Sequence, residues 1–104
     1  NWARRREIDD ETLERASLIT TDSVEQARVE AGDLIIPANA GKFDWERVWE
    51  LADIVAGDGP QRNSPYDITL YKAVGVGLED ITIAAQAYRR ACEEGLGEEI
   101  DLLR

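Results

Sequence analysis

The clearest structural signals in this chain lie in Asp67-Ile-Thr-Leu-Tyr-Lys-Ala-Val-Gly-Val-Gly-Leu-Glu-Asp80. Its start, Ile68–Lys72, is rich in β-branched and aromatic residues, which predicts a short strand. Gly75 and Gly77 then predict a turn. A long amphipathic helix is predicted to follow, because apolar residues recur every three or four positions. Its expected buried face consists of Leu78, Ile81, Ala84, Ala85, Tyr88, Ala91 and Cys92.

Helix and strand signals alternate in the first part of the chain. The predicted elements are, in order, a helix Glu11–Arg15, a strand Ser17–Thr21, a helix ending near Ala31 and a strand Leu34–Ile36. An aspartate at 9 or 10 can cap the first helix, and Asp22 or Ser23 can cap the second. Ser23 and Gln26 also fit a capping box. This order of elements predicts an α/β layered fold.

The middle of the chain predicts one more helix and the clearest loop. Asp44 can cap a helix Trp45–Ala56, whose apolar face includes Trp45 and Trp49 four residues apart. The two tryptophans either belong to the core or form an exposed apolar patch. Gly57–Pro65 predicts a loop, and Ile100–Leu103 a possible last strand.

Composition excludes several classes of function. The 104 residues fit one domain, and 43% of them are hydrophobic, enough for a small core. A net charge of −10 argues against a nucleic-acid or anionic-membrane partner, and no apolar run reaches the ~20 residues needed to cross a bilayer. Cys92 is the single cysteine, so no internal disulfide forms, and a reducing cytoplasmic location is expected. Without histidine, neither a zinc site nor a Ser-His-Asp triad is expected.

Six motifs with matching order and spacing carry a family resemblance. They are Asn1-Trp-Ala-Arg-Arg-Arg-Glu-Ile8, Asp22–Ala27, Ala31–Leu34, Ile54–Gly57, Gln61–Ser64 and Ile68–Gly75. On these motifs the chain resembles the ornithine cyclodeaminase/mu-crystallin family along nearly its whole length. The resemblance implies an α/β fold made of a partial Rossmann-like layer plus a strand–long helix unit, truncated relative to the family.

The resemblance also implies a division of the chain. Residues 1–57 would be the C-terminal part of a Rossmann-like nucleotide-binding domain. Residues 58–104 would be a strand and long helix that return to the substrate and dimerisation domain, so the strand Ile68–Lys72 is expected in a different layer from the first half. The family's Gly-x-Gly-x-x-Gly/Ala turn is not matched by Gly75-Val-Gly77, which lacks the third glycine. The chain is therefore expected to be the last third of such an enzyme.

Site residues follow only from the resemblance. Asn1 matches a family Asp or Asn beside the nicotinamide, and as an amide it can orient a substrate but cannot act as a base. Arg5 matches a Lys near the substrate carboxylate, which a guanidinium can grip with two hydrogen bonds. Ala73 and Val74 match a Ser-Val pair that contacts cofactor and substrate, but Ala73 lacks the hydroxyl.

Each of these residues also has a plainer interpretation. Asn1 can be a frayed terminal residue, Arg5 a solvated arginine, and Ala73 and Val74 a packed strand end. Lys72, Glu79 and Asp80 flank the turn and could suggest an acid/base set. The carboxylates in the first helical turn are better explained by the helix dipole.

Two functions are weighed. The first is a C-terminal fragment of an NAD- or NADP-dependent ornithine cyclodeaminase, amino-acid dehydrogenase or ketimine reductase. That fragment is expected to be inactive alone and to bind no cofactor by itself. The alternative is a stand-alone, non-catalytic α/β protein that self-associates as a structural or interaction module. In both cases a homo-oligomer is expected, without nucleic acid, membrane or metal.

Overall fold

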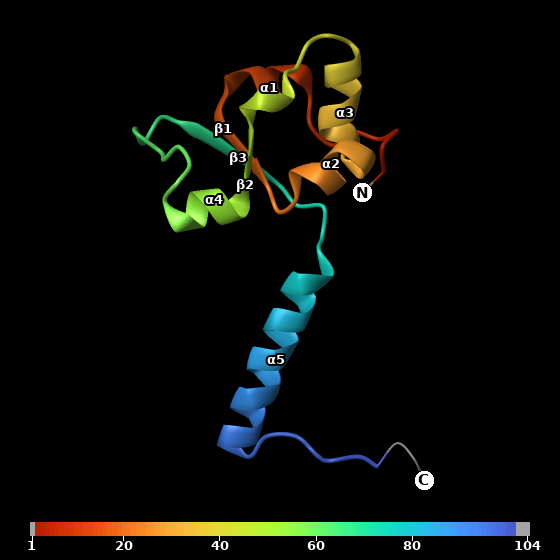
Figure 1. Ribbon diagram of the computed structural model, residues 1–104, viewed down its shortest axis with the longest axis vertical. Coiled ribbons are helices and arrows are strands. Elements are labelled where there is room, and N and C mark those ends of the chain that lie inside the picture. The colour runs from red at the N-terminus through yellow and green to blue at the C-terminus, as the bar shows by residue number, and fades with distance from the viewer. Residues whose placement is uncertain (1, 102–104) are drawn as a thin grey trace.

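A small parallel sheet forms the centre of the molecule. The computed structural model describes residues 2–101. The strands β1 (Ala16–Thr21), β2 (Val48–Glu50) and β3 (Ile68–Lys72) lie in the order β2-β1-β3, and both neighbours run parallel to β1 (Figure 1). Parallel neighbours need crossover connections, which here contain helices. The α/β class and the predicted strands at 17–21 and 68–72 are confirmed.

Helices flank and connect the strands. They are α1 (Asp10–Arg15), α2 (Val24–Glu30), α3 (Gly32–Asn39), the 3₁₀ turn η1 (Trp45–Arg47), α4 (Leu51–Ala56) and α5 (Gly77–Glu94). Three predicted N-caps are confirmed, because Asp9, Ser23 and Asp44 each accept a backbone N–H from the turn that follows. Within residues 2–101 no helix is long and apolar enough to cross a membrane.

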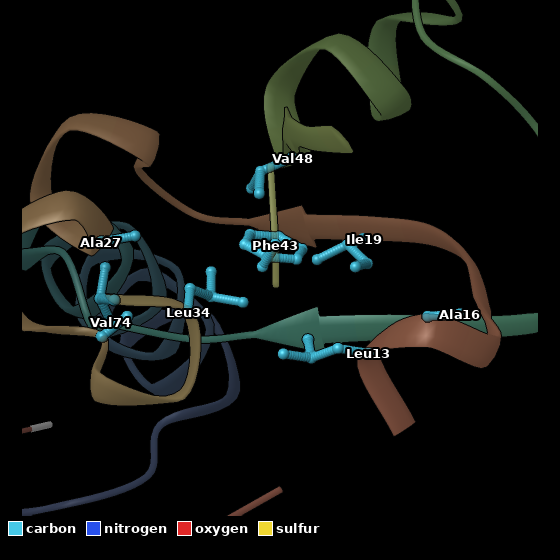
Figure 2. Close-up of a cluster of buried hydrophobic side chains, with 9 residues drawn as sticks. Leu13, Ala16, Ile19, Ala27, Leu34, Phe43, Val48 and Val74 are labelled. Carbon is cyan, nitrogen blue, oxygen red and sulfur yellow. The ribbon is translucent and has the colours of Figure 1, made fainter. Parts of the chain in front are cut away.

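The core lies around β1. Three consecutive residues of this strand, Ile19, Thr20 and Thr21, are buried, so both faces of the sheet are covered at its centre. The buried cluster comprises Leu13, Ala16, Ile19, Ala27, Ala31, Leu34, Phe43, Val48 and Val74. Figure 2 shows that Ala27, Leu34 and Val74 lie together, which joins α2, α3 and the segment after β3.

The predicted strand at 34–36 is wrong. Leu34 and Ile35 donate their N–H groups to the carbonyl of Ala31, which starts α3 directly after α2. Leu34 and Pro37 are both buried, a helical spacing. A run of three apolar residues has no period of its own, so packing against the core decides its conformation.

The single helix predicted at 45–56 is wrong in its first half, whereas Leu51–Ala56 is helical and forms α4. Val48–Glu50 forms β2, which pairs with Ile19–Thr21, so the sheet overrides the helical pattern there. Trp45 and Trp49 therefore share no helical face. Trp45 is partly buried against the core, whereas Trp49 is partly exposed on the edge strand.

The helix predicted after Gly77 is confirmed, but the predicted burial of its apolar face is wrong. Figure 1 shows α5 standing away from the sheet. Leu78, Ile81 and Tyr88 are exposed by 75%, 69% and 72%, and Cys92 is exposed as well. An isolated helix has nothing against which to bury a stripe.

The expected separation of 68–72 from the first layer is wrong, because β3 pairs with β1 in one sheet. The division at residues 57 and 58 stays a prediction. Ile100 and Asp101 lie outside any strand. The remainder of the predicted last strand falls outside the described residues.

Candidate functional site at the carboxyl edge of the sheet

The carboxyl ends of β1 and β3 lie side by side. Thr21 pairs with Lys72, the last residue of β3. Ligands of open α/β sheets bind outside the carboxyl ends of the strands. The two segments that leave this edge, Asp22 and Ala73–Gly75, are therefore where a ligand is expected. This placement includes two of the residues that the sequence singled out.

Asp22 holds the loop after β3. Its Oδ1 accepts the N–H of Val74 at 2.8 Å and its Oδ2 accepts the N–H of Gly75 at 2.7 Å. The hydroxyl of Thr21 donates to Oδ1 at 3.0 Å. Burial by itself would raise the pKa of Asp22, but these backbone N–H groups and the hydroxyl outweigh it and hold the pKa below 3.8. The carboxylate is therefore charged at neutral pH.

Two further side chains fix the same edge. Gln26 Nε2 donates to the carbonyl of Gly75 at 3.3 Å and also hydrogen-bonds Glu30. Glu50, the last residue of β2, accepts the N–H of Val24 at 2.8 Å. The start of α2 is thus bound both to the end of β2 and to the loop after β3.

Lys72 belongs to a second polar cluster below this edge. Its Nζ lies 2.9 Å from Asp33 Oδ2 and 3.5 Å from Glu7 Oε2. Asp33 Oδ1 also accepts the N–H groups of Glu7 at 2.6 Å and Ile8 at 3.1 Å. The Asp33 and Lys72 side chains are only 4% and 15% exposed, so this ion pair is largely withdrawn from water.

Both members of the pair keep their charge. Burial would raise the pKa of Asp33, but the hydrogen bond from Lys72 and the two backbone N–H groups hold it below 3.8. Burial would lower the pKa of Lys72, but the contact with Asp33 outweighs it and raises the pKa above 10.5. Lys72 therefore stays protonated, its charge is balanced by two carboxylates, and it is a poor candidate for a proton donor.

A small cavity of about 150 Å³ opens beside this pair. Its lining residues are Trp2, Arg5, Glu7, Gly32, Asp33 and Lys72. The guanidinium of Arg5 lies 5.0 Å from the centre of the Trp2 ring, a cation–π contact. A Cβ on Gly32 would lie 2.2 Å from the carbonyl oxygen of Arg5, so only glycine lets the N-terminal segment cross the start of α3.

The predicted site residues are only partly brought together. Arg5 shares the cavity with Lys72, which directly precedes Ala73 and Val74. The side chain of Val74 is buried in the core, and its N–H is bound to Asp22, whereas Ala73 is exposed. Asn1 lies outside the described residues. Among residues 2–101 no group of three or more His, Cys, Asp or Glu side chains could hold a metal ion.

Sequence reasoning missed what Asp22 and Asp33 do. Asp22 was considered only as a helix cap, and Asp33 was given no role. Both are carboxylates inside the motifs quoted above, and that is the only signal the sequence offers. The partners of Asp22 lie 52 and 53 residues away, so no local pattern contains them.

The comparison with known proteins decides the family. The model of the ornithine cyclodeaminase/mu-crystallin family matches residues 2–95. This chain belongs to that family. A Δ1-pyrroline-2-carboxylate reductase of Bacillus cereus is 34% identical over 96 residues, which are 91% of this chain and 30% of the relative.

Solved structures agree in fold. The Δ1-pyrroline-2-carboxylate reductase of Thermococcus litoralis, in complex with NADH and L-proline, matches with a TM-score of 0.82 and 39% identity over 94% of this chain. An archaeal alanine dehydrogenase dimer with bound NAD matches with a TM-score of 0.73 and 27% identity over 95% of it. The predicted Rossmann-like fold of the family is confirmed. The chain spans about 30% of the length of these relatives.

Proposed function

We propose that this chain forms the nicotinamide side of an NAD- or NADP-dependent oxidoreductase site that acts on an amino acid or a cyclic imine. The observation that carries the proposal is the loop Ala73–Gly75, which Asp22 holds at the carboxyl edge of a parallel sheet. A relative that shares this fold over 94% of the chain binds NADH and L-proline. The cofactor would supply the hydride chemistry, and the protein would position it.

The chain fits one end of such a cofactor. The 104 residues contain no Gly-x-Gly-x-x-Gly turn to hold a pyrophosphate. The exposed Ala73 has a small apolar side chain without a hydrogen-bonding group, which suits contact with a ring rather than a phosphate. Asn1, by family resemblance, would orient the substrate. From the sequence alone we expect no cofactor binding by this chain; with the loop Ala73–Gly75 held in place, we now propose weak binding through the nicotinamide end.

Arg5 is the proposed group for the substrate carboxylate. Lys72, the other cation that lines the cavity, already forms ion pairs with Asp33 and Glu7. Arg5 pairs with no carboxylate within the described part of the chain, so its guanidinium is available for a bidentate contact.

A graft tests the proposal. We would replace the matching 30% of the Thermococcus litoralis reductase with this chain and assay NADH-dependent reduction of Δ1-pyrroline-2-carboxylate. We expect activity in the graft, and a higher KM for the imine in Arg5→Met. Arg4→Met is the matched control, because Arg4 is an exposed neighbour that does not line the cavity. A folded graft that neither binds NADH nor reduces the imine would refute the proposed function, and equal effects at Arg4 and Arg5 would refute the role of Arg5.

The second candidate is a non-catalytic interaction module. The observation that favours it is the exposed apolar stripe of α5, where Leu78, Ile81 and Tyr88 have no covering element among residues 2–101. Such a stripe favours self-association. The archaeal alanine dehydrogenase relative is a dimer, and we extend that state to this chain as part of the proposal. A monodisperse oligomer that binds no cofactor would support this candidate over the first.

A location in a reducing compartment, the cytoplasm, belongs to the same proposal. Cys92 is a free and exposed thiol, which would be oxidised in an oxidising environment. Nucleic acid is not among the proposed partners, because the net charge is −10.

A further inference from the structure

We propose that Asp22 is a positioning residue, whose carboxylate fixes the loop Ala73–Gly75 in the orientation that receives the nicotinamide end of the cofactor. This inference rests on the proposed function, since it assigns the residue that prepares the same site. Neither the family resemblance nor the comparisons assign any role to this side chain.

The geometry is that of an anion bound by consecutive backbone amides. The N–H groups of Val74 and Gly75 both point at one carboxylate, at 2.8 and 2.7 Å, and Val74 makes a second contact with Oδ2 at 3.1 Å. Gly75 has a φ of +86°, a conformation that glycine accepts readily and that lets adjacent amides converge on an anion. Hydrogen bonds to an ionised acceptor are about twice as strong as neutral ones.

Two other contacts hold the loop at its buried side and at its end. The Val74 side chain is held in the core, and the Gly75 carbonyl accepts from Gln26 at 3.3 Å. Between them, the peptide planes that precede Val74 and Gly75 can rotate unless their N–H groups are held. Asp22 holds both. It therefore decides how the exposed Ala73 and the adjoining backbone face the carboxyl edge.

Replacing Asp22 should loosen the loop without dissolving the core. Asp22 follows the last residue of β1 and is half-buried at the edge of the sheet, outside the hydrophobic cluster. Asp22→Ala leaves an anion-sized space in front of two N–H donors. A small carboxylate such as formate can occupy that space, whereas it cannot repair a fold that has lost packing.

The test uses the 104-residue chain and its amide signals in NMR spectra. Hydrogen exchange at Val74 and Gly75 should become about tenfold faster in Asp22→Ala, because a charge-assisted hydrogen bond is lost there. Excess sodium formate should restore the protection. Asp58→Ala is the matched control, an exposed loop aspartate, and it should leave both amides unchanged.

Titration with NADH on the same samples links the loop to the site. In the wild-type chain, NADH should shift the amide signals of Ala73–Gly75. Asp22→Ala should need about tenfold more NADH for the same shifts. Formate should restore the NADH concentration that the wild-type chain needs. Unchanged exchange in Asp22→Ala would overturn the inference, and so would faster exchange with unaltered NADH response. A wild-type chain without NADH-induced shifts at this loop would instead count against the proposed function, and the assignment of Asp22 would fall with it.

Discussion

The pair of Asp33 and Lys72 offers the sharpest test of how this small fold is held together. Asp33→Asn keeps the size of the side chain and one oxygen that can accept the N–H of Glu7. It removes the negative charge that faces Lys72 at 2.9 Å. The remaining partner of Lys72 would be Glu7, at 3.5 Å and with a side chain that is 84% exposed.

The expected cost follows from the burial of the pair. Removing one member of a buried ion pair typically costs about 3–5 kcal/mol, because the other charge stays uncompensated. Lys72 is 15% exposed and keeps Glu7, so we expect the lower end, about 3 kcal/mol. Domains of this size are stable by only about 5–15 kcal/mol, so the variant should be visibly weakened.

Urea unfolding followed by tryptophan fluorescence measures this cost, with Trp45 as a reporter that packs against the core. Lys72→Met completes a double-mutant cycle, and Asp33→Asn should cost much less in that background because no ammonium is left unpaired. Glu11→Gln is the control, since it breaks the ion pair with Arg15. The Glu11 and Arg15 side chains are 73% and 64% exposed, and such an exposed pair contributes about 0–1 kcal/mol. If Asp33→Asn costs no more than Glu11→Gln, or if the two changes at 33 and 72 simply add, the ion pair does not stabilise the fold.

Four other predictions concern Gly32, Gly77, the two aspartates Asp22 and Asp33, and the exposed face of α5. Gly32→Ala should destabilise by more than about 2 kcal/mol in urea unfolding, because the new Cβ would lie 2.2 Å from a backbone carbonyl oxygen. Gly77→Ala, at the start of α5 with nothing within 4 Å, should be neutral or slightly stabilising by the same measurement. On acidification, the contribution of Asp22 and Asp33 to the free energy of unfolding should be fully present well above the ordinary pKa of an aspartate and should be lost as the pH falls toward and through their lowered native pKa values. Asp33→Asn should flatten that fall in urea titrations at stepped pH. Ile81→Glu should lower the mass measured by light scattering if the α5 stripe drives self-association, and an unchanged mass would place the contact elsewhere.

Much of the fold could be predicted from the sequence because its signals are local. The caps at Asp9, Ser23 and Asp44 lie two or three residues from the N–H groups that they accept. The strands β1 and β3 are runs of five or six residues with β-branched and aromatic side chains. The residues within each of these elements are therefore enough to predict its conformation.

Other parts depended on contacts that a local pattern does not contain. Val48–Glu50 lies inside a longer run, Trp45–Ala56, whose apolar residues have a helical spacing, but the edge of β1 offers backbone partners and these three residues pair with it. The stripe on α5 was correctly predicted to be apolar. An amphipathic pattern predicts that one face of a helix packs against something, but it does not identify the partner. In this structure the face of α5 is exposed.

The residues that carry the family resemblance differ from those that would determine which substrate is used. Asp22, Gln26 and Asp33 belong to motifs that carry the resemblance, and in the structure each binds backbone groups of a distant segment. Such side chains determine how the sheet edge is built, and an edge of this shape can serve several related reactions. The groups that we propose face a ligand are Arg5 and Ala73, where, by the family resemblance, the sequence departs from the cyclodeaminase pattern. Substrate preference should therefore respond to changes at these two positions, while changes at Asp22 or Asp33 should alter the site for every substrate alike.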